Sequence, residues 1–361
     1  MIILGIETSC DDTGVAIVEA DERRSKRGLT RIFNIRSNIV SSQIKVHQKY
    51  GGVVPNLAAR EHLKNLEPCL RQAFVEAKVT PENIDLITVT IGPGLIPCLL
   101  IGVNFAKTLA YVWKKPIIGI NHIEAHIIAN YFENSEIKFP VIALVVSGGH
   151  TQLVLMENFG KYKILGETRD DAAGECFDKV AKLLGLGYPG GPAIAAEAAK
   201  YQIRATKYEI RLPRPMIKHK SYDFSFSGLK TAVLYVTINN KQQIMNKKFI
   251  QKLCHETQQA IIDVLIEKTI RAAKEYRAKT VILSGGVAAN DELRKQLQKK
   301  IRDTKYQIRD TNFLVPSKIL CTDNAAMIAA AGYFRYKFGK PKTDWKNISA
   351  DANLRIDQKM R

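Results

Sequence analysis

The chain begins MIILGIETSCDDTGVAIV (residues 1–18), which is an apolar run, a polar loop and a second apolar run. Residues 2–6 suit a buried strand, residues 7–14 are mostly polar and end in glycine, and residues 15–18 are apolar again. Two short apolar runs joined by a tight polar loop predict two adjacent strands. The same plan returns in VIALVVSGGHTQLVLM at residues 141–156. We therefore predict a tandem duplication.

The likeness extends along each half of the chain. In the first half, residues 86–91 resemble a buried strand, and a Gly-Pro-Gly turn and a helical run to residue 113 follow. In the second half, the apolar residues 281–283 precede Ser-Gly-Gly and a helical run at 288–301. Strands that alternate with helices predict a mostly parallel α/β sheet in each half.

A chain of 361 residues is long enough for two domains, each with its own core. We place the first domain at residues 1–138 and expect a C-terminal helix at about 323–340 to complete it. The second domain then spans residues 139–322 and carries helical and basic insertions.

Charge favours a polyanionic partner. The chain has 54 Lys and Arg against 35 Asp and Glu, a formal net charge of +19. Nucleic acid is the first candidate, and a compositional bias toward lysine is the alternative. The basic residues concentrate in two segments, 23–31 and 200–220. The second of these has seven Lys or Arg, one acid and two prolines, and reads as an exposed arm.

The cysteines and the uncharged stretches indicate the cellular location and the class of protein. The six cysteines form no C-x-x-C pair, which argues against a zinc ribbon and against a secreted disulfide scaffold. The chain opens on an apolar strand without a basic leader, and glycine and proline interrupt the uncharged stretch at residues 91–106. We expect a cytoplasmic protein without a membrane partner.

Two glycine-bearing loops follow predicted strands, Ser147-Gly148-Gly149 and Ser284-Gly285-Gly286. Glycine lets backbone N–H groups approach an anion closely, and ligands of open α/β sheets bind at the carboxyl ends of strands. One such loop is often only a turn, but two at matching places predict a phosphate site. Neither loop has the G-x-x-x-x-G-K-[ST] pattern of a Walker nucleotide site.

A metal site is predicted from His122, His126 and Asp323. The two histidines are four residues apart, which places both on one face of a helix. Asp323 opens the equivalent helix of the other half, so we expect both halves to contribute ligands in one cleft. Two imidazoles and one carboxylate leave coordination positions open. The order H-I-E-A-H lacks the H-E-x-x-H base of zincin proteases.

Eleven motifs together resemble one family, the tRNA adenosine threonylcarbamoyltransferases, which are called TsaD in bacteria and were formerly described as glycoprotein endopeptidases. The resemblance runs from residue 1 to about residue 334. The motifs are GIETSCD (5–11), YGGVVP (50–55), GPGL (92–95), NHIEAH (121–126), VSGGHT (146–151), DDAAGE (170–175), FDK (177–179), YPGGP (188–192), FSFSGLK (224–230), SGGVAAN (284–290) and TDN (322–324).

The resemblance implies a duplicated ribonuclease-H-like fold, as in actin, heat-shock ATPases and sugar kinases, with two lobes around a central cleft. It implies that His122, His126 and Asp323 hold one divalent metal, iron(II) ahead of zinc. It also implies a site for threonylcarbamoyl-AMP, in which ATP or another adenine nucleotide would fit. The residues of that site would be Val145, Val146, Ser147, Gly148, Gly149, Asp178, Gly191 and Asn290.

The implied reaction is acyl transfer to the exocyclic amine of the adenosine beside the anticodon, with release of AMP. An aryl amine is a poor nucleophile, so a carboxylate base is attractive, and we assign that role to Asp12, or to Asp11. Implied partners are tRNA, the inactive paralogue TsaB and the small ATPase TsaE. The rival functions are an ATPase or sugar kinase of the same fold and a metalloprotease.

Overall fold

In the computed structural model the chain forms two compact units. Unit 1 comprises Met1–Lys138, Met156–Lys163 and Pro316–Arg361, and unit 2 comprises Phe139–Leu155 and Ile164–Val315. The structure describes residues 1–25, 28–134, 137–201, 210–240, 242, 246–304, 311–339 and 343–358, with the backbone alone at 23–25 and 28–31.

Unit 1 contains a five-stranded sheet in the order β3-β2-β1-β4-β5. The opening motif forms its antiparallel hairpin, in which Ile3 of β1 pairs with Val18 of β2, while β4 and β5 join in parallel. The sheet is therefore mixed, because a tight loop reverses the chain and a helical crossover does not. The strands are β1 (Ile2–Glu7), β2 (Asp12–Ser25), β3 (Gly28–Ser42), β4 (Leu86–Gly92) and β5 (Ile117–Asn121).

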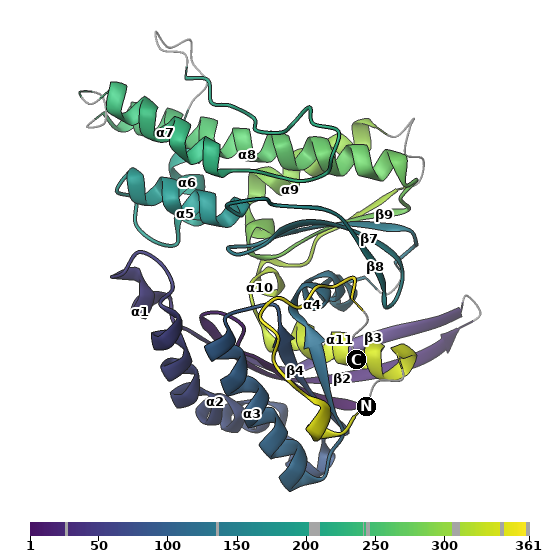
Figure 1. Ribbon diagram of the computed structural model, residues 1–361. Helices are drawn as coiled ribbons and strands as arrows, with labels where there is room; N and C mark the ends of the chain where they lie inside the picture. Colours follow the sequence, from purple (N-terminus) through teal and green to yellow (C-terminus); the bar gives the residue numbers. More distant parts are fainter. Residues whose placement is uncertain are drawn as a thin grey trace. The chain divides into compact units, whose positions relative to one another are not determined.

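Helices cover both faces of this sheet (Figure 1). Leu4 and Ile6 of β1 join the core beneath α2 (Pro55–Ala77) and α3 (Ile96–Trp113). Side chains alternate along a strand, so Gly5 faces the other side, where α11 (Ala325–Phe334) packs. A Cβ atom on Gly5 would lie 2.1 Å from the carbonyl oxygen of Ala325. The absence of a side chain at Gly5 therefore lets α11 approach the strand.

Helix α3 is the one described helix that is long and apolar enough to cross a membrane, by length and composition only. As predicted, the Gly-Pro-Gly turn interrupts the stretch at residues 91–106, and the helix begins only at Ile96, with Pro97 in its first turn, where proline is tolerated. One face of α3 packs against β4 and α2 in the core of unit 1.

Unit 2 contains a second five-stranded sheet, in the order β10-β9-β6-β7-β8. This order matches unit 1 strand for strand, with β6 in the place of β1 and β9 in the place of β4, and β6 and β9 are likewise parallel. The duplication is confirmed. The strands are β6 (Val141–Val146), β7 (Thr151–Asn158), β8 (Lys161–Glu167), β9 (Thr280–Ser284) and β10 (Asn312–Leu314).

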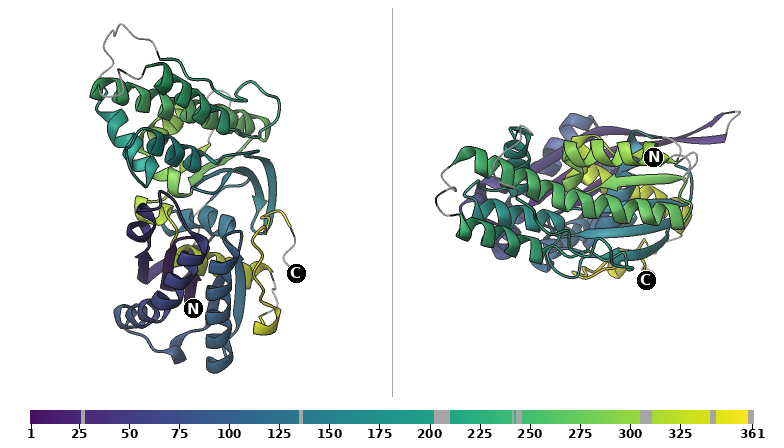
Figure 2. Two further views of the ribbon diagram at one scale, coloured as in Figure 1. Left: turned by 60° about the vertical axis from the view of Figure 1, so that its left-hand side comes forward. Right: turned by 90° about the horizontal axis from the view of Figure 1, so that it is seen from above.

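The helices of unit 2 include α8, the long green helix that packs along α6 and α7 (Figures 1 and 2). Its buried residues recur through most of its length, as expected for a helix covered by several neighbours. The helices are α5 (Ala173–Leu183), α6 (Gly190–Ala199), α7 (Ser227–Asn239), α8 (Lys247–Glu275) and α9 (Asp291–Asp303), with the 3-10 turn η3 (Gly286–Ala289) before α9.

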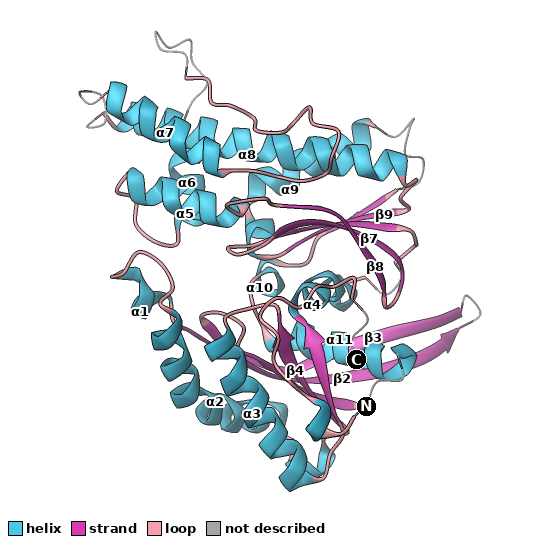
Figure 3. Cartoon of the chain, viewed as in Figure 1, coloured by secondary structure: helices cyan, strands magenta, loops and turns pink. Residues whose placement is uncertain are grey.

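Shorter elements complete the chain (Figure 3). Helix α4, which is buried along its whole length, follows β5 in unit 1. The remaining elements of unit 1 are α1 (Ile44–Gln48), α4 (His122–Ile128), α10 (Lys318–Cys321) and the short helical turns η1 (Pro81–Asn83), η2 (Ala129–Phe132), η4 (Arg335–Gly339) and η5 (Trp345–Asn347).

Candidate metal centre and ligand-binding loops

Helix α4 carries the two predicted histidine ligands on one face. Asn121 caps the helix, because its side-chain oxygen accepts hydrogen bonds from the backbone N–H groups of Ile123 and Glu124, at 2.9 and 3.2 Å. The cap fixes where the helix starts and hence where His122 and His126 point. Their ring centroids lie 4.6 Å apart.

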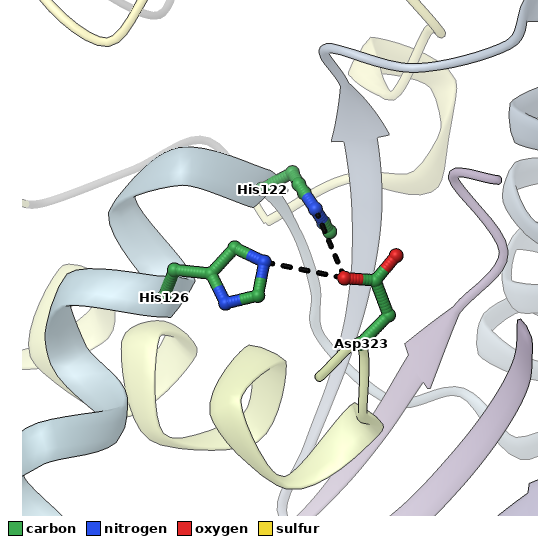
Figure 4. Close-up of side chains that lie close together, drawn as sticks. All are labelled: His122, His126 and Asp323. Atoms are coloured by element: carbon green, nitrogen blue, oxygen red, sulfur yellow. Dashed lines mark ion pairs between the residues drawn. The ribbon is translucent and has the colours of Figure 1, made fainter. Parts of the chain in front are cut away.

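Asp323 lies directly before α11, and its carboxylate points at both rings (Figure 4). Oδ1 of Asp323 is 3.2 Å from Nε2 of His126 and 3.5 Å from Nε2 of His122. One ligand atom from each of the three residues lies within 4.8 Å of the others. The three side chains predicted as ligands are therefore brought together in a group that could hold a metal ion.

The expectation that the two halves share the ligands is wrong, because all three belong to unit 1. Helix α11 follows the second repeat in sequence but packs on β1, β2 and α4. Asp323 therefore reaches the histidines as part of a helix that completes the first sheet.

The state of His126 fits a metal ligand. The side chain is fully buried, and neither ring nitrogen makes an aligned hydrogen bond to any residue that the structure describes. Nε2 faces Oδ1 of Asp323 at 3.2 Å, a close approach that is an ion pair only when the ring is protonated. A buried polar group without a partner is costly, and a cation at Nε2 would supply one. Burial lowers the pKa of His126, which keeps a lone pair available for coordination.

Glu7, at the end of β1, lies behind His122 and was not among the predicted site residues. Its buried Oε2 lies 3.0 Å from Nδ1 of His122 and accepts a hydrogen bond from Oγ1 of Thr90 at 2.7 Å. A carboxylate behind a histidine leaves the other ring nitrogen for a metal. The only signal in the sequence was an acid at the start of the polar loop.

The carboxylates also set the charge of His122. Burial by itself would lower the pKa of this imidazole, but Asp323 and Glu7 outweigh burial and raise its pKa to about 10. His122 is consequently protonated at neutral pH in the metal-free protein. A divalent cation would have to displace that proton, so metal binding should release it.

Asp11 and Asp12, the proposed bases, follow β1 in the same unit. The backbone N–H of Gln43 donates to the carbonyl oxygen of Asp11 and holds the loop. Burial, and then the negative charge of Asp323, raises the pKa of Asp12 to about 7. Its Oδ1 atom is buried without a hydrogen-bond partner among the described residues.

Two buried histidines, His62 and His47, support the loop that carries Asp11 and Asp12 through hydrogen-bonding contacts. His62 of α2 contacts the carbonyl oxygen of Cys10 through Nε2 at 2.9 Å and Oγ1 of Thr13 through Nδ1 at 2.8 Å. Gln43 lies between His62 and His47, at 3.4 and 3.0 Å. Burial lowers the pKa of His62, so this ring stays neutral and acts as a structural hydrogen-bonding group.

The predicted adenylate-binding residues all lie in unit 2. Val145 and Val146 end β6, and the loop from Ser147 to Gly149 is closed by a hydrogen bond from Ser147 N to His150 O at 2.8 Å. A Cβ atom at Gly148 or Gly149 would meet no atom within 4 Å, so both glycines border open space.

The other predicted adenylate contacts have structural partners as well. Oδ1 of Asp178 accepts from the N–H of Gly190 at 2.7 Å, beside Gly191, which also borders open space. Asn290 caps α9 at the N–H of Leu293 and donates to Oε1 of Gln258 at 2.8 Å. Turn η3, just before Asn290, contacts both β6 and α5, so these segments gather at one end of the sheet.

Comparisons with known proteins give the family. The family model for tRNA N6-adenosine threonylcarbamoyltransferase, TsaD, matches residues 34–330. The chain belongs to this family. A relative of that name from Syntrophomonas wolfei is 48% identical over 335 residues, which cover 93% of this chain and 92% of the relative. Another, from Thermosipho africanus, is 47% identical over 98% of both chains.

The family membership identifies the protein as a transferase that modifies tRNA, by adding a threonylcarbamoyl group to N6 of adenosine. Solved structures agree on the fold alone. HypF from T. kodakarensis aligns with a TM-score of 0.57 at 14% identity, over 95% of this chain and 48% of HypF. Component A of (R)-2-hydroxyglutaryl-CoA dehydratase from Acidaminococcus fermentans aligns with a TM-score of 0.50 at 14% identity, over 92% of this chain and 99% of that chain.

Proposed function

We propose that the donor is threonylcarbamoyl-AMP and that the acceptor is the adenosine adjacent to the anticodon, in tRNAs that read codons beginning with adenosine. The observation that carries this proposal is the group of His122, His126 and Asp323, backed by Glu7. The reactions of a sugar kinase or an ATPase of the same fold do not require a His-His-Asp group.

In the proposed step the N6 lone pair attacks the carbamoyl carbon, a C–N bond forms, the C–O bond to the phosphate breaks, and AMP leaves. The amine loses a proton, which Asp12 would accept, with Asp11 as the alternative. A pKa of about 7 suits Asp12 to this role, because a base works best when its pKa lies near the working pH.

The cation at His122, His126 and Asp323 would polarise the carbonyl group or neutralise phosphate charge. Two imidazoles and one carboxylate suit iron(II), which we favour, and also zinc. The adenylate would bind at residues 145–149, Asp178, Gly191 and Asn290. Support comes from the open space at Gly148, Gly149 and Gly191, where backbone N–H groups can approach an anion.

We further propose that the enzyme acts in the cytoplasm with TsaB and TsaE as partner subunits. Its net charge of +19 supports a large anionic substrate, since tRNA phosphates are neutralised by Lys and Arg. A metalloprotease finds no support in α4. Glu124, the acid between the two histidines, is buried in an ion pair with Arg335 and is not available as a base.

The test is an incubation of the metal-loaded protein with threonylcarbamoyl-AMP and unmodified tRNA, followed by mass spectrometry of the nucleosides. We expect threonylcarbamoyladenosine and AMP in equal amounts, and loss of product with Asp323→Ala. Parallel incubations with ATP and a sugar panel, and with a peptide panel, test the rival functions. Product in either of these, with none from tRNA, would overturn the proposal.

A further inference from the structure

Helix α4 has a second face whose role differs from that of the ligand face. His122 and His126 lie on one side, and Glu124, two residues from each, lies about 200° around the helix. Its carboxylate therefore belongs to the back of the helix. Glu124 is nevertheless only 2% exposed. A buried carboxylate is tolerated only when it is paired and hydrogen-bonded.

Both oxygens of Glu124 have partners. Oε2 accepts from Nε of Arg335 at 2.5 Å, and Oε1 accepts from the hydroxyl of Tyr162 at 3.0 Å. The Arg335 side chain is itself only 20% exposed. One carboxylate thus joins three segments of unit 1 that are distant in sequence: α4, the first turn of η4 and the start of β8.

Arg335 directly follows α11, and Asp323 lies just before the residue that caps its start. Helices α4 and α11 are therefore joined at two places, by Asp323 with the histidines at one end and by Arg335 with Glu124 at the other. Two attachment points restrict both sliding and rotation of one helix against the other. Phe159 stacks on Phe334 with ring centroids 4.2 Å apart, which braces the end of α11 beside the ion pair.

We propose that Glu124, held by Arg335 and Tyr162, is a positioning residue that sets the spacing between the two histidines and Asp323 and thereby the affinity for the metal. This inference rests on the proposed metal centre. Glu124 touches neither ligand nor substrate and acts only through the helix. Loss of a group that orients metal ligands costs about 10–100-fold in affinity, and we expect about tenfold for this indirect case.

The experiment uses the full chain, stripped of metal by a chelator and titrated with Co²⁺. The variants are Glu124→Gln, Arg335→Met, the double variant and Tyr162→Phe. The control is Glu19→Gln, which removes the carboxylate of another Arg–Glu pair of unit 1, with Arg36 at 2.8 Å. The readouts are the Co²⁺ dissociation constant, the d–d absorption spectrum of bound Co²⁺ and the free energy of unfolding without metal.

We expect Glu124→Gln and Arg335→Met to weaken Co²⁺ binding about tenfold and to change the d–d spectrum. Tyr162→Phe, which keeps the ion pair, should weaken Co²⁺ binding less. It tests the inference if the other variants fail to fold. The double variant should recover stability, because removing both partners leaves no unpaired buried charge, but it should not recover Co²⁺ affinity.

Three results would overturn the inference. The first is a Co²⁺ affinity and spectrum in all variants equal to those of Glu19→Gln. The second is a double variant that recovers both its stability and its Co²⁺ affinity, because the Glu124–Arg335 pair would then stabilise the fold without positioning the ligands. The third is parent protein that binds no Co²⁺, which would reject the metal centre itself and is distinct from the other two.

Discussion

Glu7 and His122, 115 residues apart in sequence, form a buried pair in which the carboxylate lies 3.0 Å from Nδ1 of the ring. The contact exists because β1 and β5 flank β4 in one sheet and end at the same edge. Glu7 follows the apolar stretch of β1, and His122 begins the helix after β5. The pair fixes the ring so that Nε2 faces Asp323.

The first prediction concerns this pair. Glu7→Gln should lower the pKa of His122 from about 10, because one of the two carboxylates that raise it loses its charge. NMR titration of the metal-free protein measures this pKa. After correction for the proton that the metal displaces from His122, the affinity of Glu7→Gln for Co²⁺ should be about 10–100-fold lower than that of the parent. The reason is that the carboxylate no longer orients the ligand. Glu61→Gln, on a surface ion pair with Lys64, is the control, and equal affinities in the two variants would contradict the prediction.

The second prediction concerns pH. A base must be deprotonated, so the transfer rate should rise with pH as Asp12, whose pKa is raised to about 7 in the metal-free protein, loses its proton, and Asp12→Asn should abolish this rise. Stability should show the opposite trend. A pKa raised from 3.8 to about 7 in the folded state means that stability is lost as the pH rises between these two values and stays constant above them. Thermal unfolding should therefore find Asp12→Asn more stable than the parent at pH 8 and equal to it at pH 4. A stability difference that does not depend on pH would refute the assignment.

The third prediction concerns the packing of α11. Gly5→Ala would place a Cβ atom 2.1 Å from the carbonyl oxygen of Ala325, so the helix must shift. We expect a loss of about 1–3 kcal/mol or more in the free energy of unfolding, together with weaker Co²⁺ binding, because Asp323 moves with the helix. Urea denaturation and Co²⁺ titration measure the two effects. Gly228→Ala, where a Cβ atom has open space within α7, should not lower stability and should leave Co²⁺ binding unchanged, and a Gly5→Ala protein with parental values would contradict the packing argument.

The fourth prediction concerns the basic arm at residues 200–220, of which 202–209 lie outside the described part of the chain. From the sequence we expect Arg204, Arg211, Arg214 and Lys218 of this arm each to contact a phosphate. Arg214 is instead engaged within the protein, because its guanidinium bonds to Glu256 and Asp263 of α8 at 2.5 and 2.9 Å. Lys218 and Lys220 are exposed. Replacing both with Gln should flatten the salt dependence of tRNA binding by about 0.7–0.9 log units per lost contact.

Arg214→Met serves as the control for the arm. It should reduce stability by leaving two carboxylates unpaired, and it should leave the salt dependence unchanged. The measurement is tRNA affinity at several salt concentrations. Parallel lines for the parent and the double lysine variant would show that Lys218 and Lys220 do not contact tRNA.

The repeated strands were predictable because their pattern is local. Two apolar runs joined by a tight polar loop indicate a pair of adjacent strands, and this pattern occurs at β1 and β2 and again at β6 and β7. The spacing of His122 and His126 also needs only the geometry of a single helix. The expectation of mostly parallel sheets was wrong because the same tight loops reverse the chain, which gives each sheet antiparallel strands on one side.

The sequence alone determined the duplicated fold, the two histidines, the glycine loops and the family resemblance, since each of these depends on residues that are close together in the sequence. Only the tertiary structure decided how closely Asp323 approaches the two histidines, that Glu7 lies behind His122, and that Glu124 is paired with Arg335. These contacts join residues 115 to more than 200 positions apart. Their distances depend on how β1, β4 and β5 align in the sheet and on how α11 packs on β1 and α4, and no spacing within a motif contains that information.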